Sequence, residues 1–407
     1  MNARSPRLRL LATAMIVDAL GSGLFGPFGL LYGHEVAGLP LAAAGAAIGI
    51  ASVIALAAGP LAGALVDRLG AARVIVLANS VAVAGGLLLL TARDIWSFTL
   101  ASVLGVAAVR MFWSGFAPLV GSVAADRAER WLGYLRSARL AGVMLGGFAA
   151  SAVLAADRDH GLTLMLAVDT ASYALAGILT AVATAGTRHP AVHAVSPSVD
   201  APSSYRTVLR DRALLHVTAL NISCTLLVSA PVIALPVYLI DSVRAPVWLP
   251  GLATGLLTGL VAAAMTRTPH LTRGTGRLRV LALATLLWAT GCLLLLPVPL
   301  NPVAATLTAV VVLAAAQAFY EPTADTIALA LAPPHLTGRY TAVYQLAWGV
   351  SSALAPALVG TLLSVEPAAL WITLAVIAAV TAAAYRHAET RLGDRTGRSG
   401  AALATLP

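Results

Sequence analysis

Apolar runs of about 20 residues, separated by short polar segments, constrain this 407-residue chain most strongly. A helix needs about 20 apolar residues to cross the hydrocarbon core of a bilayer. Hydrophobic residues make up 59% of the chain and charged residues only 11%, so polar side chains are too few to cover a soluble fold of this length. The chain is therefore predicted to be an all-α membrane protein.

Twelve runs are long enough to cross a bilayer. The predicted spans are 9–32, 41–66, 74–92, 96–122, 134–155, 162–185, 213–240, 247–266, 279–297, 302–332, 339–364 and 367–385. Between the two sets of six lies the longest polar stretch, in which a short surface helix is expected near Tyr205 to Arg212. We predict a six-helix bundle at 1–186, a cytoplasmic linker at 187–211, a second bundle at 212–386, and a disordered cytoplasmic tail at 387–407.

The distribution of arginine predicts the orientation of the chain. With both termini placed in the cytoplasm, the inside segments hold 22 of the 26 basic residues, whereas the outside loops hold only Arg93, Arg158 and Arg244. This asymmetry satisfies the positive-inside rule and requires an even number of crossings. The arginines form no single patch, so a nucleic-acid partner is not expected despite the net charge of +9. We expect a monomer in the cytoplasmic membrane, surrounded by lipid.

The two halves share short motifs in the same order. The pattern G-x-x-R-V-x-x-L-A occurs at Gly70–Ala78 and again at Gly276–Ala284, after the second span of each half. An aromatic-x-Pro pattern in the fourth span, Phe116–Pro118, is repeated in the tenth at Tyr320–Pro322. The order of these echoes predicts two six-helix pseudo-repeats, an arrangement in which substrate binds near the midplane between the halves.

A charged hairpin joins the second and third spans. Its pattern is Gly63-x-x-x-Asp67-Arg68-x-Gly70-x-x-Arg73. Gly70 permits a tight reversal, and the Asp67 carboxylate is short enough to accept backbone N–H bonds at a helix N-terminus or to pair with an arginine. The arginines are expected on the headgroup side of the membrane.

This hairpin, at this place among twelve spans, resembles the signature loop of the major facilitator superfamily, and the chain is most similar to the twelve-span drug:proton antiporter branch. In that family the loop latches the two halves together on the cytoplasmic side. The match is partial, because Ala71 and Ala72 stand where the family usually has basic residues. The glycine-rich antiporter motif of the fifth span is also incomplete, since Gly142 to Gly147 contains no proline.

Five charged residues lie within the predicted spans and away from the arginines at the span ends, and each is a candidate site because an unpaired charge in hydrocarbon is costly. Asp18 and Glu321 are the predicted proton-coupling acids. Arg110, which the resemblance ties to proton coupling, is predicted to modulate the acid. Structural roles remain the alternatives for Asp18, as a permanently paired carboxylate, and for Arg110, as the partner of an acid. Asp169 lies in the outer half of its span, where water can reach it from outside, so a structural role is favoured for it. Asp325 is interpreted as a residue of the latch or the cytoplasmic surface.

Aromatic and amide side chains at moderate depth predict the substrate cavity. They are Trp113, Asn221, Gln317, Tyr320, Tyr344, Gln345 and Trp348. Such a lining suits an amphipathic organic molecule better than a sugar, which needs more polar groups. Packing against a neighbouring helix is the alternative for each of them.

The predicted function is secondary active transport of a small organic, drug-like molecule by proton-coupled efflux through alternating access. The alternatives are import or export of a small metabolite, and a receptor or scaffold that transports nothing. An enzyme is not expected, because no Ser-His-Asp or zinc pattern occurs. His189-x-x-x-His193 surrounds Pro190 and lacks acidic or cysteine partners, so no metal is expected. No cofactor is predicted, and the lack of a Walker-type loop disfavours an ATP-driven pump.

Overall fold

The computed structural model of the chain describes residues 6–124, 128–185, 208–265, 267–296, 300–333 and 337–396. These residues form two compact units. Unit 1 comprises the described residues of Met1–Asp200 and Val247–Gly255, and unit 2 those of Ala201–Pro246 and Leu256–Pro407. The predicted linker falls largely at 186–207, outside the described residues.

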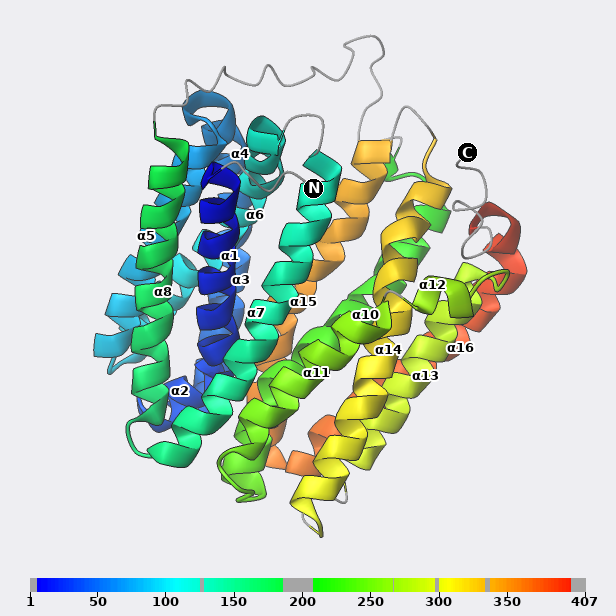
Figure 1. The fold of residues 1–407 in the computed structure, drawn as a ribbon. Coiled ribbons are helices and arrows are strands. Elements are labelled where there is room, and N and C mark those ends of the chain that lie inside the picture. The colour runs from blue at the N-terminus through cyan, green and yellow to red at the C-terminus, as the bar shows by residue number, and fades with distance from the viewer. Residues whose placement is uncertain are drawn as a thin grey trace. The chain divides into compact units, whose positions relative to one another are not determined.

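Unit 1 is built from helices joined by short connections (Figure 1). They are α1 (Pro6–Phe25), a 3-10 turn (Gly26–Phe28), α2 (Gly29–Glu35), α3 (Leu41–Ile54), a 3-10 turn (Ala55–Ala57), α4 (Ala58–Leu69), α5 (Ala71–Thr91), α6 (Ile95–Ala124), α7 (Ala128–Ala156) and α8 (Gly161–Thr184). The first residues of α11, up to Gly255, group with this unit.

Unit 2 contains the remaining helices. They are α10 (Arg212–Val237), a π-helical turn (Tyr238–Ser242), α11 (Leu249–Met265), α12 (Thr268–Leu271), α13 (Arg277–Leu294), α14 (Pro302–Leu331), α15 (Thr337–Val365) and α16 (Pro367–Thr396). Asp211 caps α10, because its carboxylate accepts hydrogen bonds from the backbone N–H groups of Ala213 and Leu214.

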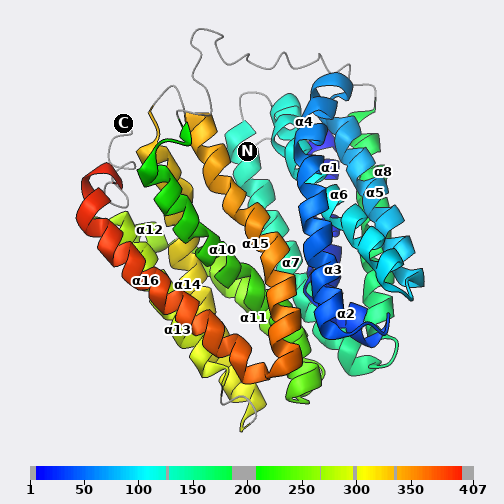
Figure 2. The ribbon, with the colours of Figure 1, turned by 180° about the vertical axis from the view of Figure 1, so that it is seen from behind.

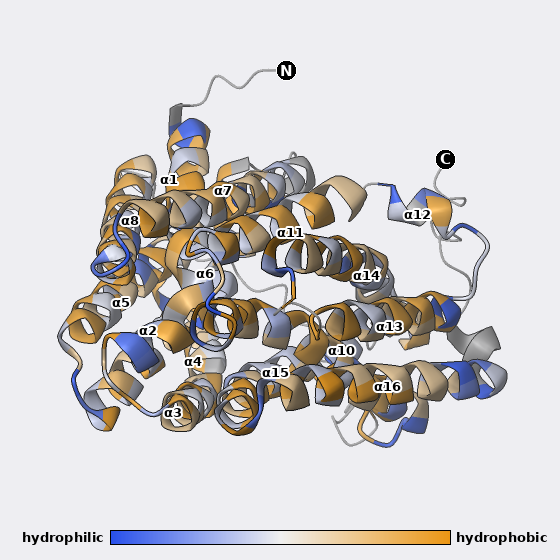
Figure 3. Cartoon of the chain, turned by 90° about the horizontal axis from the view of Figure 1, so that it is seen from below, coloured by the Kyte–Doolittle hydropathy of each residue, from blue (hydrophilic) through white to orange (hydrophobic). Residues whose placement is uncertain are grey.

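The described residues confirm an all-helical membrane architecture. Ten of their helices are long and apolar enough to cross a membrane, and the pair Leu41–Ala57 and Leu61–Leu69, bent by 44°, makes up to eleven. The helix at the predicted span 247–266, Leu249–Met265, is shorter than these. Hydrophobic residues dominate the helices, and hydrophilic stretches gather at helix ends and connections (Figure 3). Twelve crossings in two pseudo-repeats therefore stay a prediction.

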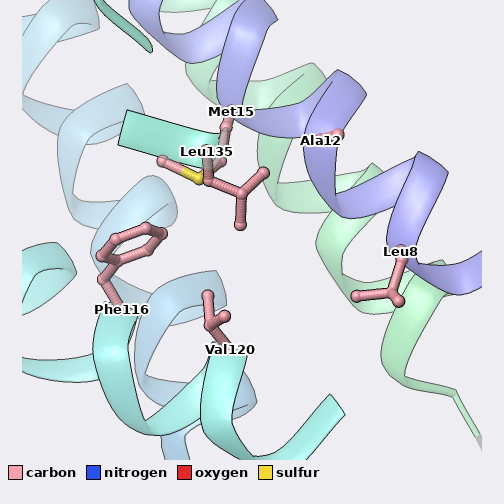
Figure 4. Packing of buried hydrophobic residues seen from close by; sticks show 6 residues of the cluster. All are labelled: Leu8, Ala12, Met15, Phe116, Val120 and Leu135. Atoms are coloured by element: carbon pink, nitrogen blue, oxygen red, sulfur yellow. The ribbon is translucent and has the colours of Figure 1, made fainter. Parts of the chain in front are cut away.

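Glycines bring α1 unusually close to α7. A Cβ atom added to Gly142 would lie 2.8 Å from the Cβ of Ala19, and one added to Gly146 would lie 2.7 Å from the backbone nitrogen of Leu24. The two helix backbones thus touch where a side chain would otherwise keep them apart. One turn towards the N-terminus of α1, buried apolar side chains of α1, α6 and α7 form a cluster (Figure 4).

Gly146→Ala should strongly destabilise unit 1, because the added methyl group meets the backbone of α1 instead of a movable side chain. We expect the midpoint of thermal unfolding in detergent to fall by several degrees. Gly105→Ala in α6 is the matched control, since nothing lies within 4 Å of its Cβ position. If both substitutions shifted the unfolding midpoint equally, the shift would come from the higher helix propensity of alanine and not from close packing at Gly146.

The last helix extends beyond the predicted boundary of the second bundle. The 387–407 segment is predicted to be disordered, but α16 remains helical to Thr396. An ion pair helps to hold this extension, with Arg279 Nη2 of α13 lying 3.0 Å from Glu389 Oε1. Figure 2 shows α13 and α16 side by side along their length. Residues 387–396 are therefore helical, and the later residues lie outside the described part of the chain.

Candidate functional site

Asp18 lies in the middle of α1 on the face that contacts α7 and α8. Its side chain is buried, with 8% of it exposed. Small residues on the same helix let the neighbours approach, and a Cβ atom at Gly21 would lie 2.7 Å from Oδ1 of Asp169 on α8. The glycine-rich sequence after Asp18 therefore lets polar groups of α1 and α8 lie in one buried region.

The carboxylate of Asp18 forms an ion pair with Arg139 of α7, through Oδ2 and Nη1. The guanidinium of Arg139 also lies over two rings of α6, at 5.5 Å from the ring centroid of Phe112 and 5.4 Å from that of Trp113. Arginine suits this position, because it stays charged, binds carboxylate in a fixed geometry and stacks on aromatic faces. The half-buried positive charge of Arg139 therefore contacts both α1 and α6.

Asp169 is also buried in the same region, with 6% of the residue exposed. It interacts electrostatically with Asp18 and Arg139. Ser172 donates a hydrogen bond of 2.7 Å to its backbone carbonyl, and the hydroxyls of Ser22 and Tyr173 lie 3.2 Å apart across α1 and α8. The interpretation of Asp169 as a residue wetted from outside is wrong for this structure, because close packing of α8 on α1 buries it.

A pocket adjoins this group of charges inside unit 1. It has an empty volume of about 370 Å³, which includes space open to solvent. Asp18, Asn79 and Thr180 are its polar lining residues, and the apolar remainder includes Met15 and Phe116, which Figure 4 shows among the surrounding side chains. Asp18 therefore lines a pocket in which only a few residues are polar and the others are apolar.

Arg110, the base predicted to act on the acid, lies half-buried on α6. The ion pair that the structure shows for Asp18 goes to Arg139 instead. The sequence does not single out Arg139, because it lies close to the predicted start of a span, next to the cytoplasmic arginines. In the structure α7 begins at Ala128, so Arg139 is 11 residues into the helix, about 16 Å along its axis.

The predicted acid of unit 2, Glu321, is half-buried on α14 and accepts a hydrogen bond of 2.6 Å from Nε2 of Gln317, one turn earlier. The same helix carries Asp325, whose side chain lies outside the described part of the structure. Gln317 of the same helix thus donates to Glu321, and Arg139 of another helix pairs with Asp18.

The predicted cavity residues divide into a buried and an exposed set. In unit 2, Tyr320 donates a hydrogen bond of 2.8 Å to Oδ1 of Asn221, and its ring packs 5.3 Å from that of Trp288. Tyr344 is buried as well, whereas Gln345 and Trp348 are exposed. In unit 1, Trp113 is 43% exposed and contacts Arg139. The structure therefore brings Asn221 and Tyr320 together. Trp113, Gln345 and Trp348 are exposed on the surface of the unit to which each belongs.

The charged hairpin forms the turn that the sequence predicts. Gly70 ends α4 and precedes α5 with φ 85° and ψ 150°, a conformation in which an L side chain is strained. Asp67, Arg68 and Arg73 are all exposed, and Gly63 lies on α4 one turn before Asp67. The hairpin therefore exposes its charged side chains where α4 ends and α5 begins.

A family model described as Major Facilitator Superfamily matches residues 11–275 and 271–404. The chain belongs to this superfamily. The predicted resemblance is confirmed at this level, and membership makes the protein a multi-pass membrane transporter and not an enzyme. Its place in the drug:proton antiporter branch stays a prediction.

Solved structures share the major facilitator fold over nearly the whole chain. A mutant of the nucleoside transporter NupG aligns with a TM-score of 0.78 at 13% identity, covering 94% of this chain and 99% of that one. The peptide transporter POT in complex with sulfate aligns at 0.74 and 15% identity, covering 96% of each chain. An auto-inhibited POT family peptide transporter aligns at 0.74 and 12%, covering 95% and 97%. No curated protein matches this member of the superfamily.

Proposed function

We propose that this protein is a secondary active transporter that expels a small, amphipathic organic molecule by alternating access in exchange for protons. The observation that carries the proposal is the ion pair between the buried Asp18 and the half-buried Arg139. Desolvating two charges inside a helical bundle costs several kcal/mol per ion, and their attraction only partly offsets that cost. A scaffold or receptor has no need to bear such a cost, whereas a carrier uses a titratable group that exchanges protons with water.

The side chains proposed to bind substrate favour an amphipathic molecule. Trp113 and Trp348 are exposed aromatic rings, and Gln345 adds an exposed amide. Aromatic surface with few polar groups binds apolar bodies that carry a small number of polar substituents. Arg139 lies against the ring of Trp113, so protonation at the ion pair can alter the position of a ring that is proposed to bind substrate.

Transport of a small metabolite is the second candidate function. It is favoured by the structural similarity to transporters of nucleosides and peptides, although at 12–15% identity this similarity concerns the fold. The buried charges are equally compatible with this function, because proton coupling does not specify the substrate.

The proposed architecture has twelve crossings, both termini in the cytoplasm, and two six-helix bundles joined by a cytoplasmic linker at 187–211. The arginine distribution supports this orientation. A monomer is sufficient for the mechanism, because both bundles belong to one chain and rocking of one bundle against the other gives alternating access.

Efflux from cells that express the protein tests the proposal. Cells are loaded with a panel of cationic dyes and antibiotics, and retention is compared with that of cells carrying an empty vector. Expression should lower the retention of at least one compound, and a protonophore should restore it. Faster efflux that a protonophore leaves unchanged would contradict proton coupling, and unchanged retention across the panel would direct the search to nucleosides and peptides.

Asp67→Asn should weaken the proposed cytoplasmic latch, because it removes the charge that can hold a helix end or an arginine of the other half. We expect cysteine pairs placed across the cytoplasmic mouth to crosslink at a lower rate than in the parent. Asp157→Asn, which changes an exposed acid ahead of α8, is the control. Unchanged crosslinking in a stably folded Asp67→Asn protein would show that the hairpin is only a turn.

A further inference from the structure

Asp169 is a buried acid to which the proposed mechanism has so far given no role. Its Oδ1 atom has no hydrogen-bond partner among the described residues. An ionised carboxylate has room for about four hydrogen bonds, and a buried charge without them is costly. A protonated carboxyl group needs far less solvation, so this environment suits the neutral acid.

Charged and titratable groups from each neighbouring helix define the surroundings of Asp169. Asp18 faces it from α1, Arg139 from α7, and Tyr173 from its own helix, and all three interact with it electrostatically or through a hydrogen bond. The remaining neighbour, α5, carries Arg73 as its charged residue, in the first turn and exposed. Gly21 leaves the space that Oδ1 of Asp169 occupies next to α1.

The balance of charge in this group requires a proton. Two carboxylates and one guanidinium carry a net charge of −1, whereas the same groups with one carboxyl protonated are neutral. Because a buried group of charges is most stable when neutral, the group binds one proton and carries its negative charge only when the proton has left. The ion pair with Arg139 keeps Asp18 ionised, which leaves Asp169 as the acid to be protonated.

We propose that Asp18, Arg139 and Asp169 form a single proton-binding site in which Asp169 holds the exchangeable proton and Asp18 remains paired with Arg139. The proposal rests on the proposed proton coupling and names the residues that perform it. One O–H bond of the Asp169 carboxyl group breaks when the proton leaves to water, and the same bond forms again when a proton returns. Exactly one proton is therefore exchanged per cycle at this site.

Infrared spectroscopy of the full chain in lipid nanodiscs measures this proton without a substrate. The carbonyl band of protonated carboxyl groups is recorded as buffer is changed from acidic to alkaline, and is compared with that of each variant. Asp169→Asn should remove the intensity of one carboxyl group. Asp18→Asn should remove the same intensity, because Arg139 then neutralises Asp169 and no proton is needed. Arg139→Gln should add one carboxyl group, because two acids are then left to be protonated.

Asp157→Asn is the matched control, and should leave the band unchanged because this acid is exposed outside the helices. Asp169→Asn keeps the ion pair of Asp18, so it should fold with parental thermal stability even if Arg139→Gln does not fold. A band that survives Asp169→Asn would overturn the assignment of the proton. A band lost in Asp169→Asn but kept in Asp18→Asn would overturn the shared site.

The spectroscopic result is independent of the proposed function. If the band behaves as expected but no compound of the dye, antibiotic, nucleoside or peptide panels is transported, the proton site stands and the function fails. If proton-driven efflux occurs but the band survives in Asp169→Asn, the function stands and the coupling residue lies elsewhere, with Glu321 the next acid to test.

Discussion

Arg139→Ala should destabilise the protein more than any other single substitution among the buried charges of unit 1. Removing the guanidinium leaves the buried carboxylates of Asp18 and Asp169 without their positive partner. Breaking a buried pair in this way typically costs about 3–5 kcal/mol, or forces the acid to take up a proton. We expect a clear fall in the midpoint of thermal unfolding in detergent, and lower expression. The loss should be smaller in acidic buffer, where both carboxyl groups are neutral.

The double variant Arg139→Ala with Asp18→Asn should recover part of this stability, because it removes one of the two carboxylates that have lost their partner. Arg136→Ala is the control, since this arginine lies one turn earlier on α7 and is exposed. If Arg139→Ala unfolds at the parental midpoint, or if the second substitution restores nothing, the ion pair does not stabilise the fold.

Asp18→Asn should abolish transport driven by a pH gradient while it spares passive exchange of substrate. The substitution keeps the shape of the side chain but leaves Arg139 and Asp169 as a neutral pair, so the site no longer needs a proton. Asp18→Glu should keep partial activity, because a titrating group survives with a different reach. The measurement is substrate-driven proton movement in proteoliposomes that contain a pH-sensitive dye, with the substrate found in the efflux panel.

Passive exchange in the same proteoliposomes shows that the variant still binds and carries its substrate. An Asp18→Asn protein that moves protons with its substrate as well as the parent does would exclude Asp18 from coupling. Glu321→Gln is the informative comparison, because this acid is bound to Gln317 of its own helix in unit 2. It should retain proton movement if the site in unit 1 is the coupling site.

The helical architecture could be predicted from sequence, because hydrophobic length alone decides which segments can cross a bilayer. Gly70 could be placed in a turn for a similar reason, since its left-handed conformation is one that glycine adopts readily. Helix ends were less predictable. The end of α16 moved from the predicted 386 to Thr396, because the pairing of Glu389 with Arg279 of another helix is a tertiary contact.

The candidate site was predicted in part. Asp18 was found because a carboxylate deep in an apolar run is conspicuous, but its partner was not. Counting arginines by side of the membrane places Arg139 with the cytoplasmic group, and no local pattern shows that it turns inward onto Phe112 and Trp113. The position of Asp169 in the outer half of a span likewise suggests contact with water. Its burial depends on Gly21 of another helix.

The glycine contacts between α1 and α7 also determine how the ion pair can respond to movement. Where Gly146 meets α1, backbone lies against backbone, and no side chain is present that could repack as the helices slide. We therefore expect α1 and α7, which carry Asp18 and Arg139, to move as one rigid unit. Opening and closing of the protein should then change the water around the pair, while the distance between Asp18 and Arg139 stays constant. The pair would therefore respond to a change in its solvation and not to a change in its geometry.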